Sequence, residues 1–302
     1  MKTIIVGMGI QGEKRFNIAG SDVVGTVDPY KKSDFKNIYD VPLNIYDSAI
    51  LCIQDDLKIE FIEYFLKNKK NVMVEKPLLS ESPKDLIRIK NLAKKNNITI
   101  YTAYNHRFEP HFINLQKILK SKKLGKIYSV RLFYGNGTAR LVRNSKWRDQ
   151  GSGVLPDLGS HILDTLNFWF DKNFDDIKIL SALKHENKTF DNVLMVKKSN
   201  PSIVAEISLV SWRNHFYADI YGEKGSAHIS SLCKWGPSSL TLRNRILPSG
   251  RPIEESTTYI KNDPTWDLEY KYFKALCKNV KSNIDNDIWI NKMLIGMKKI
   301  EF

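Results

Sequence analysis

The sequence predicts an α/β protein of two domains: a parallel sheet with helices on both faces, followed by an α+β domain with a largely antiparallel, open sheet. First, short apolar runs alternate with helical patterns up to about residue 121. Second, strand patterns separated by short turns dominate the rest of the chain. Third, a glycine-rich turn directly follows the first apolar run. We therefore predict one domain over residues 1–121 and a second over residues 122–302.

The first half alternates strands and helices. Residues 56–68 carry apolar side chains at helical spacing, and Ser82 and Pro83 are typical of a helix start. Strand followed by helix in this order predicts a parallel sheet. The predicted buried strands are TIIVG (3–7), VVGTV (23–27), AILCI (49–53), NVMVE (71–75) and ITIYTAY (98–104).

The second half begins after a helix predicted at residues 110–121 and closed by Gly125. Turn signals separate several of its strands, and strands joined by short turns pair in antiparallel fashion. A helix near residue 160 interrupts this half, and two more close the chain at 265–280 and 285–300. The predicted strands are 126–135, 177–184, 191–197, 202–213, 215–222, 226–231, 238–246 and 252–260.

Composition places the chain among soluble globular proteins, with 302 residues, 42% hydrophobic and 26% charged. Nothing in the sequence predicts a signal peptide or a membrane span, so we expect a cytoplasmic protein without a membrane partner. Its cysteines, Cys52, Cys233 and Cys277, are odd in number and far apart. This pattern favours reduced thiols and predicts neither disulfides nor a metal site.

The chain is basic, with 47 Lys and Arg against 33 Asp and Glu, a net charge of +14. The lysines are spread along the sequence, and the densest groups, at residues 67–70 and 120–123, end predicted helices, where cations favour the helix dipole. We interpret them as a lysine-rich surface, with a phosphorylated substrate as the alternative. No recognised motif accompanies the charge, so we do not expect a nucleic-acid partner.

The segment GMGIQG, residues 7–12, fits a dinucleotide-binding turn between strand and helix. Gly7 permits the tight turn, Gly9 lets a pyrophosphate approach the backbone, and Gly12 allows helix and strand to pack closely. Ile10 and Gln11 lie inside the turn and join the predicted contacts. The first domain is therefore predicted to be a Rossmann dinucleotide-binding domain.

Asp28 ends the second predicted strand, where a carboxylate can accept hydrogen bonds from a ribose diol. Its negative charge repels a 2′-phosphate and so favours NAD. Lys31 and Lys32 follow closely and leave NADP possible.

A second motif, VEKPL (74–78), lies at the carboxyl end of a predicted parallel strand, the edge where such sheets bind ligands. Lys76, followed by a rigid proline, can offer a point charge to an alcohol oxygen. Its alternative interpretation is a surface turn. Glu75, Lys76 and Gln54, which follows the preceding strand, complete the predicted cofactor contacts.

A third segment, GSGVLPDLGSHILDTL (151–166), sets Asp157 and His161 one helical turn apart. Helical periodicity places Ser160 and Asp164 on the same face. Alone, this pattern indicates an ordinary amphipathic helix with a solvated polar face. The opposite, apolar stripe contains Leu158, Ile162, Leu166 and Trp169.

These three motifs, together with YNHRFEP (104–110), KWRD (146–149) and DLEYKYFKAL (267–276), resemble the Gfo/Idh/MocA family in order and approximate spacing. This is the glucose-fructose oxidoreductase and inositol dehydrogenase group. The resemblance covers most of the chain. It implies an NAD(P)-dependent oxidoreductase that moves hydride to or from a carbinol carbon of a sugar, inositol or nucleotide sugar. It also implies a homo-oligomer, dimer or tetramer, paired through the open face of the second sheet.

By the same resemblance, Lys76 reaches the nicotinamide ribose and the reacting hydroxyl, and its bond to Pro77 is expected to be cis. Asp157 and His161 match a second catalytic pair. An imidazole with a pKa of ~6.5 can accept the hydroxyl proton near neutrality. The implied substrate-side residues are Tyr104, Arg107, Trp147 and Arg148.

Two histidines, His106 and His111, are interpreted as a loop residue and a helix-surface residue. The sequence also departs from the family pattern. The stretch between Asp28 and the strand at 49 is too short for the usual helix, strand and further helix. Gln54 and Asp55 replace the usual Thr-Pro, and the histidine expected shortly after is absent. The shortened first domain motivates the alternative of a non-catalytic dinucleotide-binding sensor or assembly subunit.

Overall fold

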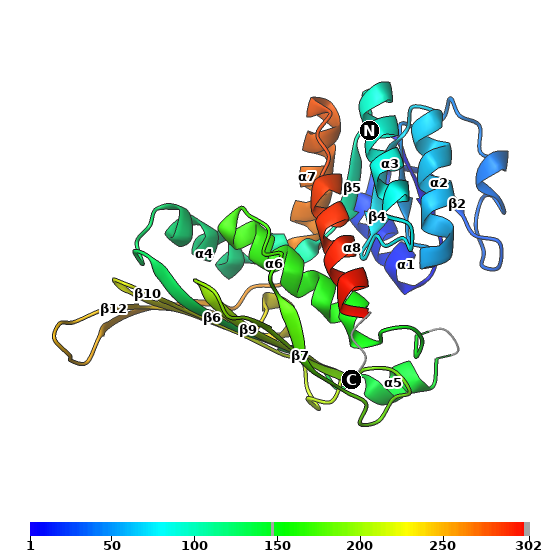
Figure 1. The fold of residues 1–302 in the computed structure, drawn as a ribbon. Helices are drawn as coiled ribbons and strands as arrows, with labels where there is room; N and C mark the ends of the chain where they lie inside the picture. Colours follow the sequence, from blue (N-terminus) through cyan, green and yellow to red (C-terminus); the bar gives the residue numbers. More distant parts are fainter. Residues whose placement is uncertain (146–147, 299–302) are drawn as a thin grey trace. The chain divides into compact units, whose positions relative to one another are not determined.

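A computed structural model describes residues 1–145 and 148–298, which form two compact units (Figure 1). The first unit contains Met1–Asn105 and Thr265–Lys292, and the second contains His106–Pro264 and the described residues from Met293 onward. By packing, the chain thus changes unit at residue 105 and returns to the first unit at residue 265. The predicted domain boundary at residue 121 stays a prediction.

The first unit is built on a five-stranded sheet in the order β2-β1-β3-β4-β5, and all neighbours are parallel. This confirms the predicted parallel sheet. Between β2 and β3 the chain forms a single 3-10 turn, Ile38–Asp40, in place of a longer helical connection. The strands are β1 (Thr3–Val6), β2 (Val23–Val27), β3 (Ser48–Leu51), β4 (Asn71–Glu75) and β5 (Ile100–Ala103).

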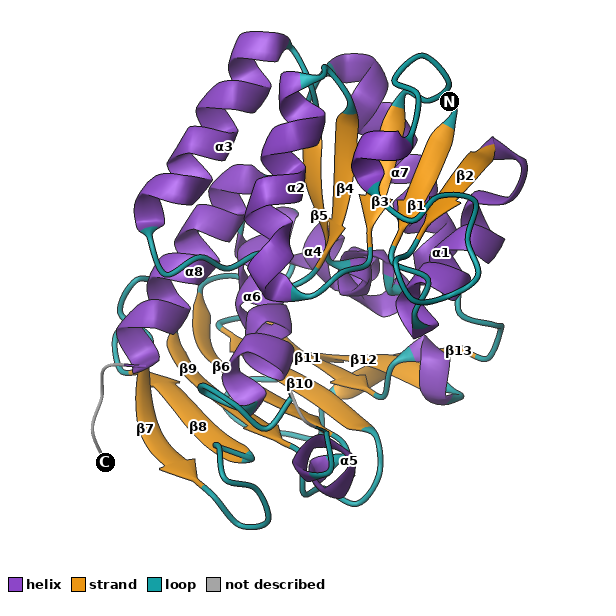
Figure 2. Cartoon of the chain, turned by 90° about the vertical axis from the view of Figure 1, so that its right-hand side faces the viewer, coloured by secondary structure: helices purple, strands orange, loops and turns teal. Residues whose placement is uncertain are grey.

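Helices cover both faces of this sheet (Figure 2). Alternate strand residues point to opposite sides, so that Ile4 packs with Phe65 of α2 and Ile89 of α3, whereas Ile5 packs with Phe273 of α7. Ser82 is the N-cap residue of α3, but its side chain makes no capping hydrogen bond. The helices are α1 (Ile10–Ala19), α2 (Asp55–Lys67), α3 (Pro83–Asn96), α7 (Thr265–Asn279) and α8 (Ile284–Lys298), which continues into the second unit.

The second unit contains an eight-stranded sheet in the order β13-β12-β11-β10-β6-β9-β8-β7. Its neighbours are antiparallel except β6 and β9, which pair in parallel. The predicted, largely antiparallel sheet is therefore confirmed. The strands are β6 (Ile127–Gly135), β7 (Lys178–Leu183), β8 (Asn192–Lys197), β9 (Ser202–Ser208), β10 (His215–Gly222), β11 (Gly225–Ser230), β12 (Ser238–Asn244) and β13 (Ile253–Tyr259).

Helices α4 (Pro110–Lys120) and α6 (Ser160–Phe170) lie on one face of this sheet (Figures 1 and 2). Alternating burial along the strands follows from this arrangement, because every second side chain points at the helices. Facing residues such as Leu132 and Phe216 are buried. A short helix, α5 (Ala139–Arg143), was not among the predicted elements.

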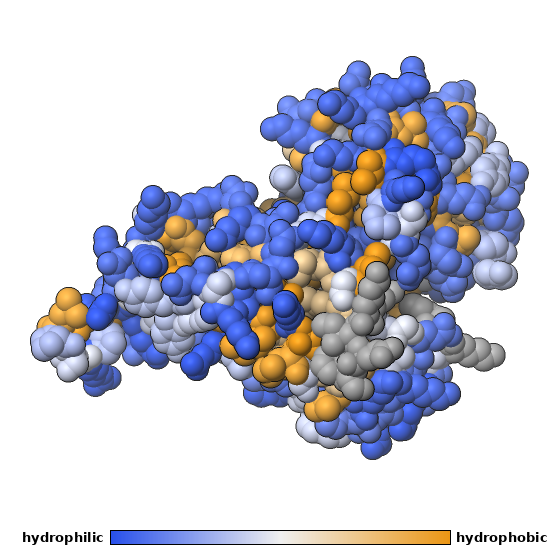
Figure 3. All heavy atoms as spheres, viewed as in Figure 1, coloured by the Kyte–Doolittle hydropathy of each residue, from blue (hydrophilic) through white to orange (hydrophobic). Residues whose placement is uncertain are grey.

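The face shown in Figure 3 is largely hydrophilic, with apolar side chains exposed at the tip of the β12–β13 hairpin, where Ile246 and Leu247 lie. The lysines at 120–123 are exposed, and of those at 67–70 only Lys70 is half-buried, as a lysine-rich surface requires. The three cysteines are free thiols. Among the described residues, none of the helices combines the length and apolarity needed to cross a bilayer.

Candidate functional site

The glycine-rich turn lies between β1 and α1. Gly7 has a φ of 89°, and a Cβ added to it would lie 2.4 Å from the carbonyl oxygen of Cys52. A Cβ on Gly12 would lie 1.9 Å from the carbonyl oxygen of Gly7. Both positions therefore exclude any larger side chain, because strand, turn and helix approach one another too closely.

Gly9 is in a different situation, since no heavy atom lies within 4 Å of a Cβ built on it. It is the N-cap residue of α1 and makes no side-chain cap. Ile10 is 75% exposed, and Gln11 is exposed as well. Open space beside an N-terminus without a side-chain cap fits a pyrophosphate, which the helix N–H groups and dipole stabilise. The turn therefore fits the dinucleotide that the sequence predicts.

Asp28 is engaged with the backbone around this turn. The N–H of Met8 donates to Oδ2 (2.7 Å), and the N–H groups of Tyr30 and Lys31 donate to Oδ1 (2.8 Å each). Burial alone raises the pKa of a carboxyl, but these three donors outweigh it and lower the pKa of Asp28. Since a carboxylate has about four acceptor positions, about one remains for a ribose hydroxyl.

The ends of three strands bring further predicted residues to one edge of the first sheet. Val6 pairs with Leu51, and Leu51 pairs with Val74. The glycine turn, Gln54 and Lys76 therefore follow the carboxyl ends of parallel neighbours, where ligands bind in open sheets. Lys76 is half-buried, and its peptide bond to Pro77 is cis, as the resemblance implies.

A largely buried network of charged side chains includes Glu75, the last residue of β4. Arg15 is 1% exposed, and its guanidinium lies 2.6 Å from Glu75 Oε1 and 2.7 Å from Glu269 Oε2. Burial disfavours the charged guanidinium, but the two carboxylates outweigh this, and the pKa of Arg15 is raised. Burial raises the pKa of Glu269 to about 7, against the opposing effect of Arg15.

Sequence reasoning missed Arg15, although a signal was present. The buried side of α1 consists of Gly12, Arg15 and Ala19, which recur at helical spacing. A charged residue on the buried side of a helix requires a buried partner. The periodicity alone could not identify that partner as Glu75, whose predicted contact with the cofactor stays a prediction.

In the second unit, Asp157 and His161 lie on consecutive helical segments. Leu155–Gly159 forms one turn of π-helix, and α6 continues from it. Ser160, His161 and Asp164 are all buried. The expectation of a solvated polar face is wrong for these three residues, which pack against the rest of the unit, whereas Asp157 is 39% exposed.

His161 stacks on His106, with ring centroids 3.9 Å apart and planes inclined by 16°. The ring of Tyr134 lies edge-on to His161 at 5.9 Å. Lys234 Nζ lies 3.3 Å from His106 Nε2, and because an ammonium only donates, this nitrogen acts as the acceptor.

His106 and His111 correct the sequence interpretation, since they are 1% and 4% exposed. His111 Nε2 contacts the carbonyl oxygen of Ser238 at 3.1 Å, and burial lowers the pKa of His111. The helix-surface interpretation is wrong because this side of α4 packs on β12. No local signal indicated the stacking of His106 on His161, which depends on contact between distant segments.

The predicted substrate-side residues have separate environments. Arg107 forms a two-point ion pair with Asp164, with Nη2 to Oδ1 at 2.6 Å and Nε to Oδ2 at 2.9 Å. Tyr104 is fully buried. Arg148 Nη2 lies 3.7 Å from Asp157 Oδ2, and Trp147 lies outside the described residues.

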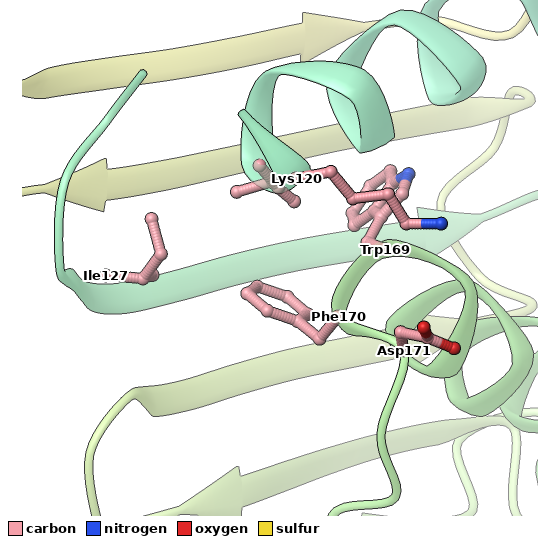
Figure 4. A pocket seen from close by; sticks show the side chains of 6 residues that line it. Lys120, Ile127, Trp169, Phe170 and Asp171 are labelled. Atoms are coloured by element: carbon pink, nitrogen blue, oxygen red, sulfur yellow. The ribbon is translucent and has the colours of Figure 1, made fainter. Parts of the chain in front are cut away.

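A hollow of about 180 Å³ opens at the other end of α6 (Figure 4). It contains none of the predicted site residues. Its lining side chains are Leu119, Lys120, Ile127, Trp169, Phe170 and Asp171.

Two family models match the chain. One, described as an oxidoreductase family with an NAD-binding Rossmann fold, matches residues 1–104. The other, the GFO/IDH/MocA C-terminal domain, matches residues 112–228. The chain belongs to the GFO/IDH/MocA family of oxidoreductases. The resemblance drawn from the motifs is thus confirmed, and the sheet that carries the glycine turn is the NAD-binding fold of this family.

Several curated relatives of this GFO/IDH/MocA chain are named as dehydrogenases. Trans-1,2-dihydrobenzene-1,2-diol dehydrogenase of Xenopus laevis is 23% identical, over 74% of this chain and 70% of that protein. Glucose-6-phosphate 3-dehydrogenase of Bacillus subtilis is 24% identical, over 52% and 41%. Inositol 2-dehydrogenase of Rhizobium meliloti is 23% identical, over 40% and 36%. The matches thus span less than half the length of the last two enzymes.

Solved structures share the fold over nearly the whole chain. Levoglucosan dehydrogenase in complex with NADH and levoglucosan has a TM-score of 0.82 at 15% identity, covering 98% of this chain and 95% of that one. GenD2 from gentamicin A biosynthesis, in complex with NAD, has a TM-score of 0.75 at 14% identity, covering 97% and 92%.

Proposed function

We propose that this family member is an NAD(H)- or NADP(H)-linked dehydrogenase or reductase of a sugar, inositol or nucleotide sugar, acting at a carbinol carbon. Relatives named as dehydrogenases of a sugar phosphate, an inositol and a diol support the proposal. The observation that carries it is the buried imidazole of His161, stacked on His106, in a chain whose other unit is an NAD-binding fold.

Oxidation of a carbinol removes a hydride and also the hydroxyl proton. A bound nicotinamide supplies the hydride acceptor. His161 takes the proton in the oxidative direction and returns it in the reductive direction. Asp157 orients the imidazole or binds a neighbouring hydroxyl. Lys76 stabilises negative charge on the substrate oxygen.

The proposed cofactor is NAD, because the anionic Asp28 at the end of β2 disfavours a 2′-phosphate. Lys31 and Lys32 keep NADP as the second candidate. Native mass spectrometry of the freshly purified protein distinguishes the two by the mass of one phosphate, provided that the dinucleotide is retained. The same spectrum reports the number of subunits, and so tests the predicted homo-oligomer.

The decisive variant is His161→Gln, with His185→Gln as the matched control, because His185 is an exposed imidazole of the same unit. Nicotinamide absorbance is followed with a panel of sugars, inositols and nucleotide sugars. We expect His161→Gln to lower kcat by about 10²-fold or more while NAD binding is retained, and the control to match the wild type. Full activity of His161→Gln excludes it as the proton carrier. A wild-type protein that binds NAD but turns over nothing in the panel favours the sensor alternative.

A further inference from the structure

Lys58 is a lysine buried inside the first unit. It lies on α2 and is 2% exposed. Its ammonium donates to the carbonyl oxygens of Glu75 (2.7 Å) and Pro77 (2.8 Å), and it lies 2.6 Å from Asp55 Oδ1. An ammonium has three donors, so these three oxygen atoms satisfy it completely. The same face of α2 buries Ile62, Phe65 and Leu66.

The two carbonyl groups flank Lys76. The last residue of β4 that pairs with β3 is Val74, and the last that pairs with β5 is Glu75. The carbonyl groups of Glu75 and Pro77 therefore lie at the end of the strand or beyond it. Pro77 has no N–H, which leaves the turn short of one backbone donor. Lys58, on helix α2, thus donates hydrogen bonds at the point where the sheet no longer provides them.

The side chain of Glu75 is held as well. Arg15 Nε donates to Glu75 Oε1 at 2.6 Å, and the guanidinium lies 4.3 Å from the ring centroid of Trp266. Arg15 belongs to α1, the helix that begins at the glycine turn. The residue before Lys76 is therefore fixed through its backbone and its side chain, by cations from two different helices.

We propose that Lys58 is a positioning residue for Lys76: by binding the carbonyl groups on both sides, it fixes the backbone from which Lys76 projects. A methionine of similar length would avoid the cost of burying a charge, but it would leave the carbonyl groups of Glu75 and Pro77 without this donor. The presence of an ammonium here therefore indicates a requirement for geometry at residues 75–77. This inference rests on the proposed role of Lys76 in turnover, and its test separates the two.

The test compares Lys58→Met with Lys197→Met. Lys197 is a matched control because it too is buried and its ammonium donates to two backbone carbonyls, those of Ser199 and Pro201, but in the second unit. Lys58→Met is expected to lower kcat about tenfold or more, to keep the Kd for NAD within about threefold, and to accelerate amide hydrogen exchange in the peptide covering residues 74–80. Lys197→Met is expected to leave all three at wild-type values.

Equal turnover and equal exchange in the two variants overturn the proposal. Should Lys58→Met fail to fold, Lys58→Arg against Lys197→Arg provides the same comparison, because the larger guanidinium displaces the donors while keeping the charge. Lys76→Met separates the hypotheses. If Lys76→Met keeps its turnover, the proposed role of Lys76 fails. If Lys76→Met is inactive while Lys58→Met turns over like the wild type, the positioning role alone fails.

Discussion

Glu269 makes the stability of the first unit depend on pH. Its carboxyl is fully buried beside Arg15, while Glu75 already provides that guanidinium with a negative partner. Burial raises the pKa of Glu269 from 4.5 to about 7. The folded protein therefore holds a proton that the unfolded chain releases, so this group stabilises the fold below pH 4.5 and loses that contribution as the pH rises towards 7.

The perturbation is Glu269→Gln, which keeps the shape and an acceptor for the hydroxyl of Tyr101 but removes the titration. A pKa that moves from 4.5 to about 7 corresponds to about 3 kcal/mol, at about 1.4 kcal/mol per tenfold change in the protonation equilibrium. The difference in unfolding free energy, variant minus wild type, should therefore rise by about 3 kcal/mol from pH 4.5 to above pH 7.

The assay is urea unfolding of both proteins at several pH values across that interval. Titrating groups far from Glu269 cancel in the difference. Glu255→Gln is the control, because Glu255 is 58% exposed, and its difference curve should stay flat. A flat curve for Glu269→Gln as well would refute the reasoning. It would mean that the contact with Arg15 offsets burial, so that folding does not raise the pKa of Glu269.

Two further predictions concern the proposed ligand contacts. Gly12→Ala places a Cβ 1.9 Å from a carbonyl oxygen and should destabilise the fold by about 1–3 kcal/mol. The Cβ of Gly9→Ala meets nothing within 4 Å, so its stability should stay within about 0.5 kcal/mol of the wild type. Gly9→Ala should nevertheless weaken NAD binding about tenfold or more. Thermal unfolding measures the stability of both variants, and an NAD titration measures the binding. Normal NAD binding by Gly9→Ala would mean that the pyrophosphate binds elsewhere. Arg107→Met should cost about 3–5 kcal/mol, because Asp164, 1% exposed, loses its ion pair with Arg107, and adding Asp164→Asn should recover part of this in urea unfolding. If Arg107→Met keeps its stability and loses only substrate affinity, Arg107 is a substrate ligand.

Most elements of the fold were predictable because periodicity is a local property. The alternation of buried residues along β10, for example, follows from the sequence of residues 215–222 alone. Periodicity shows that a strand or helix buries one face, but it does not identify the partner. For this reason the parallel pairing of β6 with β9 and the packing of α7 against the first sheet were not predicted.

The candidate site shows the same difference between local patterns, which were predictable, and contacts with distant residues, which were not. The glycine turn was predictable from the spacing of Gly7, Gly9 and Gly12, although the carbonyl oxygen that crowds Gly7 belongs to Cys52, beyond the next strand of the sheet. Arg15 and Lys58 were missed, although each is a cation on the buried side of its helix. That position is a usable sequence signal, since a buried cation must find oxygen partners. The stacking of His106 on His161 gave no such signal, because an isolated histidine fits a loop, a surface or a core equally well.

The distribution of charge also explains why the basic composition does not define the ligand site. The exposed lysines at 120–123 lie at the end of α4 and just beyond it, where they face solvent. At the edge of the first sheet, by contrast, each buried cation already has protein partners: Arg15 binds two glutamates, and Lys58 binds Asp55 and two carbonyl groups. Little of their charge remains for an anion. The affinity of this edge for a pyrophosphate must then come chiefly from the N–H groups and dipole of α1. The buried cations contribute indirectly, because they hold the backbone on which such contacts depend.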